Sequence, residues 1–479
     1  MAGKAVSLPE SGYINMLALF ACTGSVTAPQ SLVFGGFTMS MSKEIARAKL
    51  CLDGKEYELP VLQGTEGERA LDIRRLRATT GMVSYDPGMV NTGVCESNIT
   101  FVDGEKGILR FRGYDIADLT EHCSFLEVAY LLVHGFLPTP SEYNAFSKLM
   151  NLHSMLHEDM RNFFSLYPDH AHPMAILSAM VVSLSTFYPE LELDSTEAID
   201  ITVARLLSKL RTIAAFSYKK NMGQPIVYPR SDLRYCENFL NMMFHTPVNG
   251  YSPDPVITHA LNQLLILQAD HEQNCSTSVV KAVGSSRANL YASISSGICA
   301  LWGPLHGGAN QRVIEMLESV TKQGLTAAAL IERAKDKADS FKLFGFGHRV
   351  YKTYDPRAKV AKKICKQVIS HMTRTDPLLE IAMELEERAM ADSYFQERNL
   401  YPNVDFYTGL SYRAMGIPIN MFTVMFAIGR LPGWIAQWLE QRDSTENRIV
   451  RPRQIYVGPQ HRTVAETLNV STYSHPGKN

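Results

Sequence analysis

The chain has 479 residues, a formal net charge of −1 at pH 7 and 46% hydrophobic residues. This length allows roughly two to four domains, and the near-zero charge argues against a nucleic-acid-binding or membrane-surface protein. The most apolar run, residues 417–428, is shorter than the ~18–20 residues that a membrane span needs. We expect a buried helix there, and neither a nucleic acid nor a membrane as partner.

The eight cysteines are scattered without a CxxC pair, which is typical of reduced thiols in an intracellular protein. Residues 1–39 contain Lys4 and Glu10 as their only charges and no arginine. That composition fits neither a secretory signal nor a mitochondrial presequence. We therefore expect a disordered extension over residues 1–42 and a cytoplasmic location, and leave open organellar targeting by residues 1–40.

Two hairpins are predicted near the N-terminus. Residues 49–59 alternate around Asp53-Gly54, a strong hairpin signal. Residues 99–111 repeat the pattern around a turn at 103–107. A small β piece is therefore expected in this part of the chain.

Helical spacing dominates after about residue 120. Leu126, Tyr130 and Val133 share one helical face, and Val313 and Leu317 lie on another. No linker-like stretch separates these blocks, so a second domain would be an excursion from the first. The sequence predicts a mainly α protein.

The first motif of chemical interest is the stretch WGPLHGGAN at residues 302–310. His306 lies between two predicted helices, just before the second one starts near Asn310. The positive end of a helix disfavours an imidazolium, and a neutral imidazole there can donate a hydrogen bond to a developing oxyanion. The alternative is a histidine that caps the helix.

The second motif is the stretch GFGHRVYKTYDPR at residues 345–357. Its glycines allow a close approach of the backbone to a ligand, and arginine binds carboxylates bidentately. His348, Lys352 and Arg357 lie within ten residues of one another, which indicates a site for an acidic molecule. The third glycine of a dinucleotide fingerprint is missing, and the alternative is a basic surface loop.

The third motif is YPNVDFY at residues 401–407. Asp405 has Val404, Phe406 and Tyr407 as neighbours, and apolar surroundings raise the pKa of a carboxyl group by desolvation. A raised pKa suits a general base. The alternative is an aspartate that caps a helix.

Together these motifs resemble the citrate synthase family, over residues 49–457. The motifs that carry the resemblance are DHEQN (270–274), GPLHGGAN (303–310), GFGHRVYK (345–352), YDPR (354–357), PNVD (402–405) and RPR (451–453). The N-terminal hairpin and residues 239–244 are similar to the longer, bacterial-type branch of the family, often hexameric.

The resemblance implies a mainly α, two-domain helical fold with a small N-terminal β piece. The large domain would comprise residues 43–306 and 417–479. The small domain would comprise residues 307–416 and close over the substrates.

The implied reaction is the condensation of acetyl-CoA with oxaloacetate and water, giving citrate and CoA, by a transferase of the tricarboxylic acid cycle. Asp405 would remove a proton from the acetyl methyl group. His306 would bind the thioester oxygen, and His348 would polarise the ketone of oxaloacetate.

Further residues are implied for binding. The oxaloacetate or citrate residues would be His271, His348, Arg357, Arg430 and Arg451, and the CoA residues would be Lys352 and Arg398. Arg451 would come from the second subunit, so a homodimer at minimum, or a homohexamer, is implied. No metal and no other cofactor is expected; NADH or other allosteric inhibition is left open.

Two alternatives remain at this point. A 2-methylcitrate synthase would use propionyl-CoA with the same residues, and one methylene is worth only ~1–3 kcal/mol of discrimination. A non-catalytic regulatory paralogue would be expected to have lost catalytic side chains, whereas His306, His348 and Asp405 are all present.

Overall fold

The fold is taken from a computed structural model of the chain, which describes residues 42–188, 195–372 and 376–463. The chain divides into two units, Met1–Thr38 and Met39–Asn479, and everything below concerns the second. The expected extension lies outside the described residues except for Ser42, whose hydroxyl donates a 2.5 Å hydrogen bond to Glu96.

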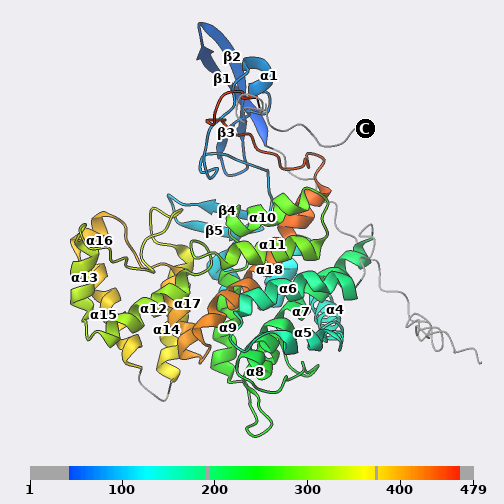
Figure 1. The fold of residues 1–479 in the computed structure, drawn as a ribbon, viewed down its shortest axis with the longest axis vertical. Helices are drawn as coiled ribbons and strands as arrows, with labels where there is room; N and C mark the ends of the chain where they lie inside the picture. Colours follow the sequence, from blue (N-terminus) through cyan, green and yellow to red (C-terminus); the bar gives the residue numbers. More distant parts are fainter. Residues whose placement is uncertain (1–41, 189–194, 373–375, 464–479) are drawn as a thin grey trace, which may run out of the picture. The chain divides into compact units, whose positions relative to one another are not determined.

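The strands form two small antiparallel sheets, drawn in blue to cyan in Figure 1. The first has the order β1-β2-β3 and the second β4-β5-β6. Their bounds are β1 Lys43–Leu52, β2 Lys55–Gln63, β3 Arg69–Leu71, β4 Thr100–Asp103, β5 Ile108–Phe111 and β6 Tyr114–Asp115.

Both predicted hairpins are present. In the first, Leu52 pairs with Lys55 across a two-residue turn. Asp53 and Gly54 adopt φ of 49° and 75°, as a type I′ turn requires. Its strands are longer than predicted. Pairing continues to Lys43 and Gln63, through mostly exposed residues of β1 and half-buried residues of β2. In the second, β4 pairs with β5 over the predicted stretch.

The rest of the described chain is mainly helical, as predicted. The helices of eight or more residues are α3 Phe125–His134, α4 Pro140–Leu152, α6 Pro173–Phe187, α7 Thr196–Asn221, α8 Tyr235–Phe244, α9 Pro255–Leu267, α10 Cys275–Gly284, α11 Leu290–Trp302, α12 Ala309–Lys322, α13 Ala327–Lys335, α14 Pro356–His371, α15 Pro377–Ala391, α17 Val404–Ala414 and α18 Phe422–Asp443. The shorter ones are α1 Leu76–Thr80, α2 Ile116–His122, α5 Met160–Leu166, α16 Ser393–Glu397 and the 3-10 turn η2 Ile419–Met421.

Several helices begin where the sequence supplies a cap. Asp254, Asp355 and Asp376 each accept a hydrogen bond from the backbone of the first turn that follows them. A proline occupies the next position in each case, where its missing N–H costs nothing. The start of α14, which carries Arg357, is fixed in this way.

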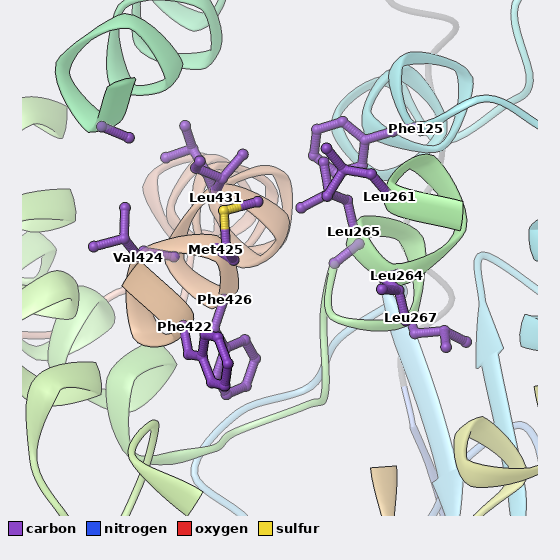
Figure 2. Close-up of a cluster of buried hydrophobic side chains, with 14 of the residues drawn as sticks. Phe125, Leu261, Leu264, Leu265, Leu267, Phe422, Val424, Met425, Phe426 and Leu431 are labelled. Carbon is purple, nitrogen blue, oxygen red and sulfur yellow. The ribbon is translucent and has the colours of Figure 1, made fainter. Parts of the chain in front are cut away.

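The centre of the hydrophobic core is α18, which packs against α3, α9, α10 and α11. Figure 2 shows side chains of α18, among them Met425 and Leu431, gathered with Leu261 and Leu265 of α9 and with Phe125 of α3. Burying a side chain of this size contributes about 1.5–3 kcal/mol. The packing of α18 on α9 therefore helps to fix the C-terminal end of α9, which is followed by the predicted site residue His271.

The segment Ile419–Asp443 is the one described helical stretch that is long and apolar enough to cross a membrane, and 89% of its most apolar window is buried inside the protein. This confirms the buried helix predicted for residues 417–428, except that the helical segment begins at Ile419. Its glycines allow an unusually close contact with the chain after α9. A Cβ on Gly433 would collide with the carbonyl oxygen of Ala269, which accepts a hydrogen bond from the Gly433 N–H.

Helices α12 to α17 lie within the predicted small domain and pack largely on one another, α14 and α12 on α17 and α13 on α15. Two of them also contact helices of the predicted large domain, α14 with α9 and α12 with α18. The boundaries at residues 306/307 and 416/417 stay predictions.

Candidate active site

Six of the predicted site residues come from six different segments. They are His271 after α9, His306 between α11 and α12, His348 in the loop before α14, Arg357 in the first turn of α14, Asp405 in the first turn of α17, and Arg430 within α18. A ring contact, a close approach of two side-chain nitrogens and charge–charge interactions connect all six.

Arg357 is buried and held by Asp355. Its Nε and Nη2 donate to the two carboxylate oxygens of Asp355 at 3.1 and 2.9 Å, a bidentate pair. Burial alone would lower the pKa of Arg357, but Asp355 outweighs it and raises that pKa. The guanidinium therefore stays charged and fixed in direction, and its Nη2 also lies 3.2 Å from Nε2 of His348.

The proton of His348 can be located from its neighbours. Nδ1 accepts from the backbone N–H groups of Val350 and Tyr351, at 3.0 and 3.3 Å. Burial, and then Arg357, lower the pKa of His348 to about 4. A neutral imidazole whose Nδ1 is an acceptor carries its proton on Nε2. With this tautomer Nε2 and Arg357 Nη2 are two adjacent donors and form no hydrogen bond with each other, so both can donate to one acceptor oxygen of a ligand.

His271 lies beside this pair. Its Nε2 is 3.0 Å from the hydroxyl of Tyr351, and its ring centroid is 5.8 Å from that of His348. Burial, followed by the charge of Arg357, holds the pKa of His271 well below its usual range. A second neutral imidazole therefore borders the same region.

His306 is held by the N-terminal turn of α10. The backbone N–H of Ser276 donates to His306 Nε2 at 3.2 Å, and the Ser276 hydroxyl lies 2.9 Å from the same nitrogen. Trp434 Nε1 donates to that hydroxyl at 3.1 Å. Since Nε2 is an acceptor, the neutral ring carries its proton on Nδ1, which leaves Nδ1–H free to donate to a ligand.

The expected neutrality of His306 is found, but its main cause differs from the predicted one. Burial lowers the pKa of His306 to about 4, and the charge of Arg430 adds to the effect. The alternative role as a helix cap is wrong, because Gly308 occupies the N-cap position of α12.

Asp405 is not a helix cap either. Asn403 caps α17, its Oδ1 accepting from the backbone N–H groups of Asp405 and Phe406 at 3.0 and 3.3 Å. Burial raises the pKa of Asp405 to about 6, against an opposing effect of Arg357. This is the direction and the cause that its apolar neighbours predicted, and it gives a carboxylate suited to act as a base near neutral pH.

Arg430 is 1% exposed and has no carboxylate partner among its hydrogen bonds in the described part of the chain. Its Nε donates to the carbonyl oxygen of Gln268 at 2.7 Å, whereas its buried Nη1 has no hydrogen-bond partner among the described residues. Burial lowers the pKa of Arg430 to about 10. The charges of Asp270 and Asp405 offset part of the cost of burying this guanidinium. An anionic ligand would supply the acceptor that Nη1 lacks among the described residues.

The three remaining predicted residues lie at the surface. Lys352 is exposed in the loop of residues 345–355, called the site loop below. Arg451 is exposed in the coil after α18. Arg398 is the C-cap residue of α16. It stacks on Tyr394, with its guanidinium carbon 4.0 Å from the ring centroid. Its neighbour Phe395 packs on Phe346 of the site loop. These positions suit contact with the periphery of a large ligand and do not test the predicted roles.

Four residues with a structural part in the site had no role in the sequence prediction. Tyr351, Asp355 and Asn403 stand inside the recognised motifs, and an asparagine two residues before Asp405 is a cap signal that could have been read. Ser276 lies 30 positions from His306, and a contact of that separation leaves no local signal. No group of three or more metal-binding side chains is placed to hold an ion within the described residues.

Comparison with known proteins identifies the family. The family model for the citrate synthase C-terminal domain matches residues 88–453. The chain belongs to the citrate synthase family. The recognised resemblance is thereby confirmed, and with it the class of transferase acting on acyl groups.

Individual members of the family are similar over most of the chain. Citrate synthase 1 of Mycobacterium tuberculosis is 50% identical over 412 residues, which is 86% of this chain and 96% of the relative. Citrate synthase from Pyrobaculum aerophilum matches with a TM-score of 0.70 at 35% identity, over 85% of this chain and 97% of that one.

A third relative was solved with ligands. Citrate synthase from Thermoplasma acidophilum, in a ternary complex with carboxymethyl coenzyme A and oxaloacetate, matches with a TM-score of 0.73 at 30% identity. The match covers 80% of this chain and 99% of that one. The predicted mainly α citrate synthase fold is thereby confirmed.

Proposed function

We propose that this chain condenses acetyl-CoA with oxaloacetate and water to give citrate and CoA. The observation that carries the proposal is the pairing of a carboxylate of raised pKa, Asp405, with two neutral histidines of opposite tautomers. One base and two proton donors of fixed direction are what an enolisation followed by a carbonyl addition requires.

In the first step the Asp405 carboxylate takes a proton from the acetyl methyl group. His306 donates from Nδ1 to the thioester oxygen, which becomes the enol oxygen, so the developing charge is stabilised without a charged acid. A neutral donor is available because burial keeps the pKa of His306 at about 4.

In the second step the enol carbon attacks the ketone carbon of oxaloacetate, and the carbonyl electron pair moves onto the ketone oxygen. His348 Nε2–H, beside Arg357 Nη2, transfers its proton to that oxygen, giving the hydroxyl group of citrate. Exchange with solvent then returns a proton to His348 and removes the one held by Asp405. Water then hydrolyses the resulting thioester, releasing CoA and citrate.

Arg357 and Arg430 would bind the carboxylates of oxaloacetate, with His271 beside them. For Arg430 the support is its buried Nη1, which has no partner among the described residues. Lys352 and Arg398 would bind CoA phosphates, and Arg451 of a second subunit would complete the oxaloacetate site in a dimer. The comparisons do not favour the 2-methylcitrate alternative, because the matched relatives are citrate synthases.

The test is release of free CoA thiol, with citrate identified as product, from protein supplied with both substrates. Thiol release must depend on oxaloacetate. Asp405→Asn is expected to lose roughly 10²–10⁴ in kcat while its circular dichroism spectrum stays unchanged. Absence of citrate from the wild-type reaction would overturn the proposal.

A further inference from the structure

The turn between β4 and β5, residues 104–107, lies directly against the backbone of the site loop. The N–H of Lys352 donates to the carbonyl oxygen of Gly104 at 2.9 Å. A Cβ on Gly104 would overlap the carbonyl oxygen of Val350 and lie 3.0 Å from its carbon. The two backbones can approach this closely only because residue 104 has no side chain.

A second glycine of the same turn repeats the relationship. A Cβ on Gly107 would lie 2.7 Å from Thr353 Oγ1 and 3.0 Å from the carbonyl oxygen of Tyr354. The turn therefore touches the loop along residues 350–354. Gly107 also has φ of 68°, so its replacement would strain the backbone as well, whereas Gly104 is not among the glycines with positive φ.

The part of the loop that the turn holds is the part that orients His348. The N–H groups of Val350 and Tyr351 both donate to His348 Nδ1. Lys352, bonded to Gly104, is the next residue along the chain. Moving residues 350–352 would move the two donors that fix the tautomer and the direction of the imidazole.

The turn is stabilised by hydrogen bonds of its own. Asp103 Oδ1 accepts from the backbone N–H groups of Glu105 and Lys106, at 3.0 and 2.9 Å. These bonds, added to the β4–β5 ladder, give the turn a defined shape against which the loop can rest.

We propose that Gly104 is a positioning residue for His348, acting through the backbone of residues 350–352. The proposal rests on the proposed condensation, in which His348 addresses the ketone of oxaloacetate. The turn would act on the direction of the His348 Nε2–H through the loop backbone.

The experiment compares Gly104→Ala with Gly93→Ala. Gly93 has no heavy atom within 4 Å of an added Cβ and no positive φ, so it controls for the change of residue type. Two quantities are measured: amide hydrogen exchange in peptides covering residues 349–354, and kcat/KM for oxaloacetate. For Gly104→Ala we expect faster exchange there and a loss of about tenfold in kcat/KM, since small misplacements of a catalytic group are costly. Gly93→Ala should change neither.

Two results would overturn the proposal: unchanged exchange at residues 349–354, or faster exchange with kcat/KM within twofold of the wild type. If Gly104→Ala does not fold, Asp103→Ala is tested in its place with the same two measurements. This variant removes the hydrogen bonds that Asp103 accepts within the turn and adds no atoms at the contact with the loop. Failure of this proposal can be told apart from failure of the proposed function. If the proposed function were wrong, the wild type would form no citrate, but the exchange measurement would still show whether the turn holds the loop.

Discussion

Nδ2 of Asn403 donates a 2.9 Å hydrogen bond to the carbonyl oxygen of Gly347. The same side chain caps α17 through its Oδ1, two residues before Asp405. Gly347 immediately precedes His348, and its own N–H donates to the carbonyl of Tyr401 at 2.8 Å. One asparagine therefore ties the segment of the proposed base to the segment of the histidine that addresses the ketone.

Replacing Asn403 by serine should separate these two functions. Serine keeps the capping acceptor but loses the donor to Gly347. We expect the free energy of unfolding to fall by no more than about 1 kcal/mol and kcat to fall roughly tenfold or more. Urea unfolding and steady-state kinetics measure the two quantities.

The matched control is Asn289→Ser. Asn289 caps α11 through Oδ1, which accepts from Ala292 N–H at 2.8 Å, and lies outside the site described above. It should show a similar small loss of stability with unchanged kcat. Equal kinetic effects of the two variants would contradict the role given to Asn403.

Ser276→Ala should affect stability more than chemistry. The backbone N–H that fixes the His306 tautomer remains, so we expect kcat to fall by less than about tenfold. Trp434 Nε1 loses its acceptor in a buried place, which costs about 1–3 kcal/mol. A loss of kcat approaching that of Asp405→Asn, at unchanged stability, would show that the hydroxyl and not the backbone orients His306.

The pH dependence of kcat/KM should follow Asp405. The base must be ionised, so activity should rise with pH through the pKa of about 6. His306 and His348, whose pKa values are about 4, stay neutral on both sides of that transition. An acidic limb centred near pH 4 would assign the dependence to a different group.

Arg430→Met should weaken substrate binding without a large change in stability. Burial disfavours the guanidinium, whereas the charges of Asp270 and Asp405 favour it, so we expect the free energy of unfolding to stay within about 3 kcal/mol of the wild-type value. Loss of a charge-assisted bond to a carboxylate should raise KM for oxaloacetate roughly 10- to 100-fold.

Arg211→Met is the control for this prediction. Arg211 is also buried, 2% exposed, and its Nη1 donates to the carbonyl oxygen of Tyr235 at 3.2 Å away from the site. Arg211→Met should leave KM for oxaloacetate unchanged. An unchanged KM in Arg430→Met would remove Arg430 from the substrate site.

Features with a local cause could be predicted from the sequence. The Asp53-Gly54 turn, the helix after His306 and the raised pKa of Asp405 each follow from a few neighbouring residues. Contacts between distant segments could not, for example Ser276 with His306 or Arg430 with Gln268, because they depend on how α9, α10, α11 and α18 pack. The cause of the neutral imidazole at His306 was misjudged for the same reason, since burial is a property of the whole fold.

The most direct test of the central claim is a comparison of kcat/KM for acetyl-CoA and propionyl-CoA at saturating oxaloacetate, with each product identified by mass. We predict citrate from acetyl-CoA and a higher kcat/KM for that thioester. A higher kcat/KM for propionyl-CoA, or no condensation product from acetyl-CoA, would contradict it.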